Sequence, residues 1–277
     1  MQIKIITDSS CDIPDEIIQK YDIGIVPNFI NVGEKSYLDG VDLSKDEFYQ
    51  NINDFHQYPK TAAPGPESFH KAYVKAAKQD YDAVISIHVD SNLSTIFHSA
   101  TRAAEISKIP VCVHDSQQLS LGSGLQIIQA CKMAEAGESV SEILKSITDL
   151  GRRTYIFAVL DTLKYLYLSG RITLASHSIG SLLRIKPLMT FHKGKAVYER
   201  VRTIKRASER MVRHILELNT LQHVSIVHTS ALDNAKKLYE RVKSVLPDGN
   251  SPYIQLVTSV VGVHVGPKAS GLVCVTN

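Results

Sequence analysis

Two short hydroxyl-bearing loops, residues 61–66 and 91–95, carry side chains that can bind an anion. Each precedes a pattern typical of an amphipathic helix. The first turn of a helix has unpaired N–H groups and a partial positive charge, so it stabilises a carboxylate or phosphate without a cationic side chain. We therefore expect Thr61 and Ser94 to converge on one carboxylate. The alternative is that each hydroxyl is an ordinary helix N-cap.

Two further side chains, His264 and Arg171, lie beside helix-breaking glycines. His264 belongs to Gly-Val-His-Val-Gly-Pro at 262–267, where glycines favour a loop and the imidazole can donate a hydrogen bond. Arg171 follows Leu-Ser-Gly at 168–170, which signals a helix end and would hold the guanidinium near a domain edge. The alternatives are a surface histidine and a surface salt bridge.

Two carboxylates, Asp8 and Asp115, end strand-like runs and so lie near the sheet edge where open α/β sheets bind ligands. A pair of carboxylates there can perform acid–base chemistry. More often an Asp in such a turn accepts backbone N–H bonds, and either carboxylate would repel an anionic ligand. We therefore expect both to shape loops.

The elements that position these residues follow from the hydrophobic pattern. Strand-like runs at 3–6, 23–29, 83–88 and 111–114 alternate with helical patterns, which predicts a parallel sheet flanked by helices over residues 1–150. Helix starts are marked by prolines and by two capping boxes. These start signals are Pro14, Pro66, Ser44 with Glu47, and Ser139 with Glu142. The apolar pattern at 119–136 predicts a helix buried at the centre.

From residue 151 onward the order of strand-like and helical patterns changes. The new order predicts a second α/β domain, residues 151–277, with a mixed sheet. Its expected strands are 155–160, a hairpin over 187–201, 224–228, 253–258 and 272–275. Its expected helices are two short patterns around Arg171 and Ile179 and two longer ones at 208–218 and 234–246. No low-complexity linker separates the halves, so we expect a broad interface with a pocket in or beside it.

Composition excludes several classes of function. Lys and Arg exceed Asp and Glu by only 31 to 28, and without a nucleic-acid motif this balance argues against nucleic-acid binding. A basic series at 200–213 predicts a solvated helix face, with a partner-docking face as the alternative. The four cysteines lack C-x-x-C spacing and should be reduced and mostly buried, and the eleven histidines lack metal-ligand spacing.

No membrane span or signal segment is expected, because the chain has no run of about 18 apolar residues and residues 1–6 enter a strand directly. We therefore expect a cytoplasmic protein that shields any lipid inside it.

Several motifs recur in one order along the chain. They are Thr-Asp-Ser-Ser-Cys-Asp-Ile-Pro at 7–14, the segments at 61 and 91–94, His-Asp-Ser at 114–116 with Ser120, Gly122 and Gly124, Leu-Ser-Gly-Arg-Ile at 168–172, Ile-Lys-Pro-Leu at 185–188, Gly-Lys at 194–195, and the segment at 262–267. In this order and spacing the sequence resembles the DegV family over nearly all of its 277 residues. It departs from the usual motifs at 62–63, at Thr95, where the family usually has glycine, and at Lys268.

The resemblance implies a two-domain DegV-like fold and a protein that binds a long-chain fatty acid. It implies the fatty-acid-binding subunit of a bacterial two-component fatty acid kinase, in which a separate ATP-dependent kinase phosphorylates the carboxyl group and the carrier is not itself an enzyme. Thr61, Ser94 and His264 would then bind the carboxylate, and Arg171 would serve the partner and phosphotransfer face. Supporting loop positions would be Ala62, Asn92 and Thr95, with no metal and no cofactor besides the bound lipid.

Two other functions remain open at this point. One is a stand-alone hydrolase or transferase that acts on a small anionic substrate through Asp8, Ser94 or Asp115. The other is a lipid-sensing interaction protein without a kinase. Residues 122–127 have two glycines of a dinucleotide fingerprint but Ile127 at the third position. The sequence contains neither a Gly-Lys-Ser/Thr phosphate loop nor a Gly-x-Ser-x-Gly elbow.

Overall fold

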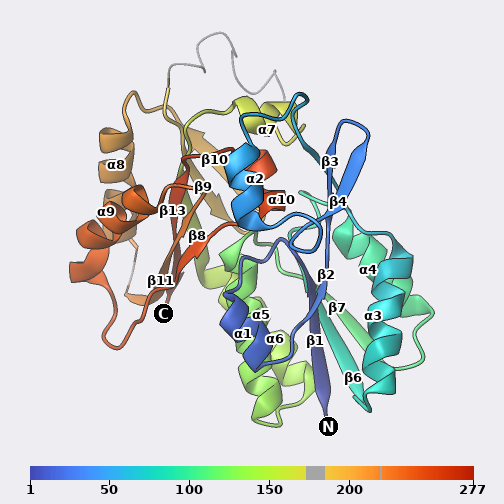
Figure 1. Cartoon of the computed structure of the whole chain (residues 1–277). Helices are drawn as coiled ribbons and strands as arrows, with labels where there is room; N and C mark the ends of the chain where they lie inside the picture. Colours follow the sequence, from blue (N-terminus) through green and yellow to red (C-terminus); the bar gives the residue numbers. More distant parts are fainter. Residues whose placement is uncertain (173–184, 219) are drawn as a thin grey trace.

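The computed structural model describes residues 1–172, 185–218 and 220–277 and contains a four-stranded parallel sheet near the N-terminus (Figure 1). Its strands, in spatial order, are β2 (Gly24–Val26), β1 (Ile3–Asp8), β6 (Ala83–His88) and β7 (Val111–Asp115). All three pairings are parallel, as the alternating pattern predicted. β1 and β6 are buried along their whole length, which is typical of a parallel sheet covered on both faces.

Helices cover both faces of this sheet (Figure 1). They are α1 (Asp15–Lys20), α3 (Pro66–Lys78), α4 (Ile96–Glu105), α5 (Leu121–Glu135) and α6 (Val140–Arg153). Ile6 and Val84 pack toward α3 and α4, whereas Ile5 and Ile85 pack toward α5, because successive strand residues point to opposite faces. Both predicted capping boxes are present.

A six-stranded mixed sheet forms the second layer, as predicted. Its strands, in spatial order, are β10 (Lys195–Glu199), β9 (Leu188–His192), β8 (Thr154–Val159), β13 (Ser270–Thr276), β11 (Leu221–His228) and β12 (Ile254–Leu256). Only β11 and β12 pair in parallel. The helices described after residue 153 are α7 (Lys164–Leu168), α8 (Ile204–Leu216), α9 (Leu232–Val242), the 3-10 turn η3 (Lys243–Val245) and α10 (Ser259–Val265). The helical pattern predicted around Ile179 lies outside the described residues.

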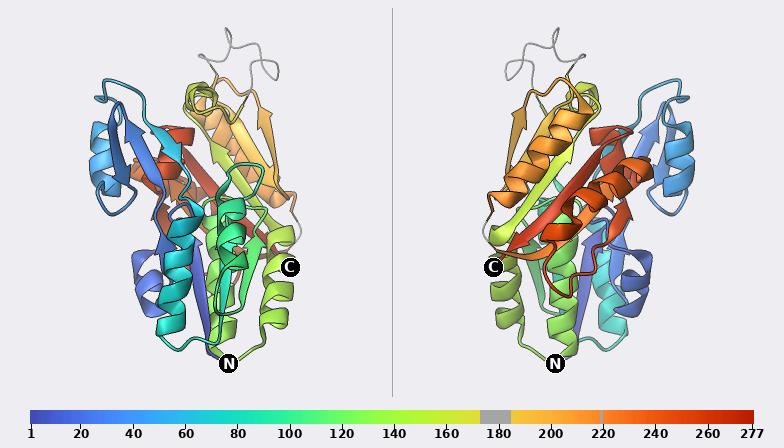
Figure 2. Two further views of the ribbon diagram at one scale, coloured as in Figure 1. Left: turned by 90° about the vertical axis from the view of Figure 1, so that its right-hand side faces the viewer. Right: turned by 90° about the vertical axis from the view of Figure 1, so that its left-hand side faces the viewer.

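Helices α8 and α9 cover the outer face of the second sheet (Figure 2, right). The inner face of α8 buries Ala207, Met211 and Ile215. The basic side chains of the 200–213 series are all exposed, which agrees with a solvated helix face. All four cysteines are free, and three of them are buried. Within the described ranges, no helix combines the length and the apolar character needed to cross a membrane.

A third, small sheet was not predicted from the sequence. It consists of β4 (Lys35–Leu38), β3 (Phe29–Val32) and β5 (Lys60–Ala62), accompanied by α2 (Lys45–Asn51). The predicted strand at 23–29 therefore divides into β2 and the first residue of β3. Ile30 and Phe48 share a buried cluster with Val263 of α10. The small sheet thus brings residues 29–62 against the C-terminal part of the chain.

The central helix α5 lies between the first and second sheets and joins their cores. Ten of its residues are buried, as the apolar pattern predicted. Ile85 of the first sheet, Leu121 and Ile127 of α5, and Ile156 and Val273 of the second sheet belong to one hydrophobic cluster. All strands of the first sheet precede residue 150 in the sequence, and all strands of the second sheet follow it. The hydrophobic cluster nevertheless contains residues from both sheets.

Replacing Gly124 by Ala should lower the free energy of unfolding by about 1–3 kcal/mol, the usual cost of overpacking a core. A Cβ at Gly124 would lie 2.5 Å from the backbone oxygen of Cys11, which cannot move without displacing the loop after β1. Gly122→Ala is the matched control, because its Cβ would meet side-chain ends of Gln118 and Ile156 at 2.9 Å. Urea unfolding should show the larger loss for Gly124→Ala, and equal losses would contradict this account.

Candidate functional site

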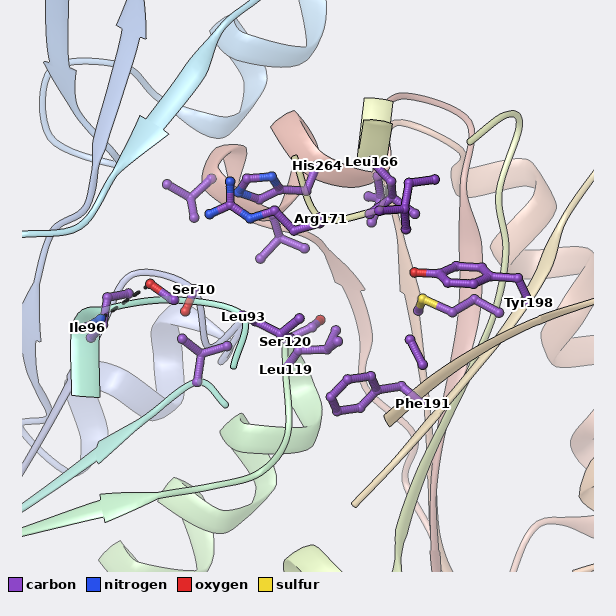
Figure 3. Close-up of a pocket in the computed structure, with 18 residues that line it drawn as sticks. Ser10, Leu93, Ile96, Leu119, Ser120, Leu166, Arg171, Phe191, Tyr198 and His264 are labelled. Atoms are coloured by element: carbon purple, nitrogen blue, oxygen red, sulfur yellow. Dashed lines mark hydrogen bonds between the residues drawn. The ribbon is translucent and has the colours of Figure 1, made fainter. Parts of the chain in front are cut away.

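A cavity of about 410 Å³ lies between the loops of the first sheet and the inner face of the second (Figure 3). Its wall comes from the loops after β1 and β6, the starts of α4 and α5, the segment from α7 to residue 172, strands β9 and β10, and α10. The lining residues are Ser10, Val89, Leu93, Ser94, Ile96, Leu119, Ser120, Leu166, Arg171, Ile172, Met189, Phe191, Ala196, Tyr198, Val260, Val261, His264 and Val265. Most of this wall is apolar, and the cavity lies beside the interface where the sequence predicted a pocket.

His264 and Arg171 lie together on one side of the cavity, opposite Leu119, Ser120 and Phe191 (Figure 3). His264 lies on α10, so the prediction of a loop there was wrong. The helix ends immediately afterwards at Gly266, whose φ is 74°. Gly266 ends the helix after His264 and does not interrupt it. The packing of α10 therefore fixes the position of the His264 ring.

Thr61 lies behind His264, at a distance of 3.0 Å between Thr61 Oγ1 and His264 Nε2. Thr61 belongs to β5, so the prediction that it lies in a loop was also wrong. Its hydroxyl contacts the imidazole and is not part of the cavity wall. The structure therefore brings Thr61 and His264 together, although 203 positions separate them in the sequence.

The other ring nitrogen of His264, Nδ1, is buried and has no hydrogen-bond partner among the residues that the structure describes. Burial, together with the nearby positive charge of Arg171, lowers the pKa of His264 to about 3. The imidazole is therefore neutral at physiological pH and carries one N–H. A buried polar nitrogen without a partner is costly.

Arg171 follows the helix end that the sequence predicted: α7 stops at Leu168, and Gly170 has a φ of 74°. Its guanidinium donates to the backbone oxygen of Ser169 at 2.6 Å, and partial burial lowers its pKa. The side chain is exposed and also lines the cavity. Arg171 therefore stands at the mouth of the cavity, beside His264.

Ser94 lines the cavity at the start of α4. Its Oγ accepts a long bond of 3.4 Å from the backbone N–H of Ile96, which leaves the hydroxyl proton available for another acceptor. The residue in the N-cap position is Thr95, whose φ of −82° is accessible to any residue, so a glycine is not needed there. The predicted supporting residues Ala62, Asn92 and Thr95 are exposed and lie outside the cavity wall.

Two serines in the wall, Ser10 and Ser120, were not predicted as site residues. Ser10 Oγ donates to the carboxylate of Asp8, and Ser120 Oγ donates to Asp12. Because each hydroxyl has one proton, both serines present only lone pairs to the cavity. They are therefore unsuited to bind an anion. The sequence signal that could have identified the bond of Ser10 to Asp8 is the Asp-x-Ser pattern at 8–10, since an Asp side chain often bonds to the residue two positions later.

The two carboxylates considered for catalysis shape loops, as predicted. Asp115 accepts N–H bonds from Ser91 and Gln117. Asp8 accepts from the backbone N–H of Ser10 at 2.9 Å and from Asn28. Burial opposes ionisation of Asp8, but its hydrogen bonds, led by that from His88, hold its pKa below the usual value.

Asp8, His88 and Ser86 form a chain of bonds in the order of a catalytic triad. His88 Nδ1 lies 2.9 Å from Asp8 Oδ2, and His88 Nε2 lies 2.7 Å from Ser86 Oγ. All three side chains are buried, and none of them lines the cavity. This series of hydrogen bonds therefore joins β1 to β6, and its side chains cannot be reached by a substrate in the cavity. Among the described residues, no group of three or more His, Cys, Asp or Glu side chains could hold a metal ion.

Comparison with known proteins gives consistent matches over the whole length. A model of the DegV family, described as uncharacterised proteins, matches residues 2–277. A DegV domain-containing protein from Clostridium acetobutylicum is 32% identical over 277 residues, covering 98% of each chain.

Solved structures of similar proteins share this fold. A DegV family protein from Thermus thermophilus, described as binding fatty acid, has a TM-score of 0.91 at 28% identity and covers 100% of both chains. DegV from Bacillus subtilis, described as a fatty acid binding protein, has a TM-score of 0.88 at 27% identity and covers 100% of both chains. A stearic acid-binding protein from Eubacterium ventriosum has a TM-score of 0.89 at 27% identity, covering 99% of this chain and 98% of that one. On these matches, the chain belongs to the DegV family.

Proposed function

We propose that this protein binds one long-chain fatty acid in the cavity of about 410 Å³. The observation that carries the proposal is a division of the cavity wall: most of it is apolar, but Arg171 and His264, which lie together, and Ser94 bring hydrogen-bond donors to it. A fatty acid has the same division, with an anionic group at one end of a hydrocarbon chain. The fatty-acid-binding descriptions of several solved DegV structures support this assignment.

In this proposal the carboxylate is held by three donors. Arg171 supplies positive charge and a planar pair of N–H groups, which suit a carboxylate. When the Thr61 hydroxyl donates to His264 Nε2, the single ring proton lies on Nδ1, the atom without a partner. Ser94 adds its hydroxyl proton. Thr61 thus acts on the carboxylate indirectly, by setting the tautomer of His264.

Most of the affinity comes from burying the hydrocarbon tail, at roughly 0.8 kcal/mol for each methylene before entropic costs. Leu93, Leu166, Phe191 and Val261 supply apolar surface along the cavity. The polar residues at the mouth chiefly orient the ligand, since an unpaired carboxylate would not enter an apolar cavity.

We also propose that the bound carboxylate is presented to a separate ATP-dependent kinase, which forms an acyl phosphate. Arg171 is exposed as well as part of the wall, so a carboxylate beside it would be reachable from outside while the tail stays covered. The stand-alone hydrolase or transferase has less support, because Asp8 and Asp115 are committed to loop hydrogen bonds.

Replacing Ser94 by Ala should weaken fatty-acid binding by about 1–2 kcal/mol, the scale of one hydrogen bond to a charged group. Ser91→Ala is the matched control, because Ser91 lies in the same loop but outside the cavity wall. Isothermal titration with a fatty acid should show a higher Kd for Ser94→Ala only. Equal affinities for the two variants would remove Ser94 from the site.

The contribution of His264 to affinity should not change between about pH 8 and about pH 6, across the usual pKa of histidine. Its pKa of about 3 means that lowering the pH over this interval adds no proton to the ring. We expect His264→Gln to raise the Kd for a fatty acid by the same factor at both pH values. A factor that grows at the lower pH would show instead that a charged imidazolium pairs with the carboxylate.

Arg171→Ala should lower both fatty-acid affinity and acyl phosphate formation with an added fatty acid kinase, and Arg171→Lys should restore part of each. Lysine keeps the charge but loses the planar donor pair. The protein alone with ATP and Mg²⁺ should form no acyl phosphate. ATP turnover by the purified protein alone would support the enzyme alternative, and unchanged affinity in Arg171→Ala would place the arginine outside the carboxylate site.

A further inference from the structure

A second, smaller cavity of about 40 Å³ adjoins the fatty-acid cavity on the inner face of the second sheet. The two cavities share the wall residues Leu119, Ser120, Met189, Val261 and Val265, so only these side chains separate them. The remaining wall of the small cavity is mostly apolar, with His228, Thr229 and Ser270 as its polar residues. Such a space accepts hydrocarbon more readily than water.

The small cavity exists because small residues occupy the middle of one cross-strand row. Met189 of β9 pairs with Ala158 of β8, Ala158 pairs with Gly271 of β13, and Gly271 pairs with Val227 of β11. All four residues line the small cavity. Residues paired in this way stand side by side on one face of a sheet, so Ala158 and Gly271 leave a depression between Met189 and Val227.

The depression is bounded on one side by a row of larger residues. Two positions along the strands, Phe191 pairs with Ile156, and Ile156 pairs with Val273. Because side chains two positions apart share a face, these three large side chains limit the depression in that direction. Gly271 cannot fill it, since a Cβ there would lie 2.6 Å from the backbone oxygen of Phe157.

We propose that the depression formed by Ala158 and Gly271 receives the methyl end of the acyl chain and sets the length of chain that binds best, with Met189 as the movable partition. This inference rests on the proposed function, because it requires the carboxylate at Arg171 and His264. Met189 is suited to the partition, because its unbranched thioether side chain adopts several conformations at little cost. A chain too short to pass Met189 leaves the depression empty.

The experiment measures the Kd of a homologous series of straight-chain saturated fatty acids for the full-length protein and its variants. Wild-type affinity should rise with chain length and level off once the depression is filled. Ala158→Val, which places two methyl groups in the depression, should leave short chains unaffected and level off at a shorter length. Each methylene kept out should raise the Kd roughly fourfold, the equivalent of about 0.8 kcal/mol.

Ala62→Val is the matched control, because Ala62 is also a strand alanine but lies on β5, outside the walls of both cavities. Its preferred chain length should equal that of the wild type. Met189→Ala, which removes the partition, should move the preference toward longer chains. If Ala158→Val does not fold, as judged by thermal unfolding, Ala269→Val fills the same cavity from its other side.

The outcomes separate the two proposals. An unchanged preferred length in a folded Ala158→Val protein, or an equal loss of affinity at every chain length, would overturn the assignment of the depression and leave the fatty-acid site intact. A wild-type protein that binds no fatty acid of any length would overturn the proposed function itself.

Discussion

The buried carboxylate of Asp12 holds together the three segments on which the cavity depends. Its φ is 52°, its side chain is fully buried, and it accepts bonds from Ser120 Oγ and from the backbone N–H of Thr258 at 2.6 Å. Burial raises the pKa of Asp12, and these bonds oppose that shift. A buried carboxylate is costly unless its oxygens are bonded. Asp12 therefore ties the loop after β1 to Ser120 at the start of α5 and to the start of α10, the helix that carries His264 near its end.

The same bonds divide the polar groups of the cavity into acceptors and donors. Ser10 and Ser120 give their protons to Asp8 and Asp12 and face the cavity only as acceptors. His264, whose Nδ1 has no partner among the described residues, stands with Arg171 at the mouth. In the proposed function, these engaged protons disfavour the carboxylate beside Ser10 and Ser120, whereas Arg171 and His264 favour it at the mouth.

Local signals in the sequence predicted most elements well. Capping at Ser44 and Ser139 depends on residues three positions apart, and the parallel strands follow from short apolar runs. The same reasoning was wrong for Thr61 and His264, which it placed in loops. Thr61 is in a strand because β5 pairs with β3, and His264 is helical because α10 packs against the small sheet. Neither contact has a nearby sequence signal, so tertiary packing overrode the glycine and proline pattern.

By itself, the sequence determined the two α/β layers, the buried central helix, the family resemblance and the types of side chain available to a carboxylate. These properties arise from periodicity and from hydrogen bonds that span a few residues. Only the tertiary structure decided that Thr61 contacts His264, that Arg171 lines the same cavity as His264, and that Ala158 and Gly271 form a depression. Those arrangements depend on strand register and on helix packing between distant segments. Contacts of this kind produce no periodic pattern of residues in the sequence, so the sequence alone does not indicate them.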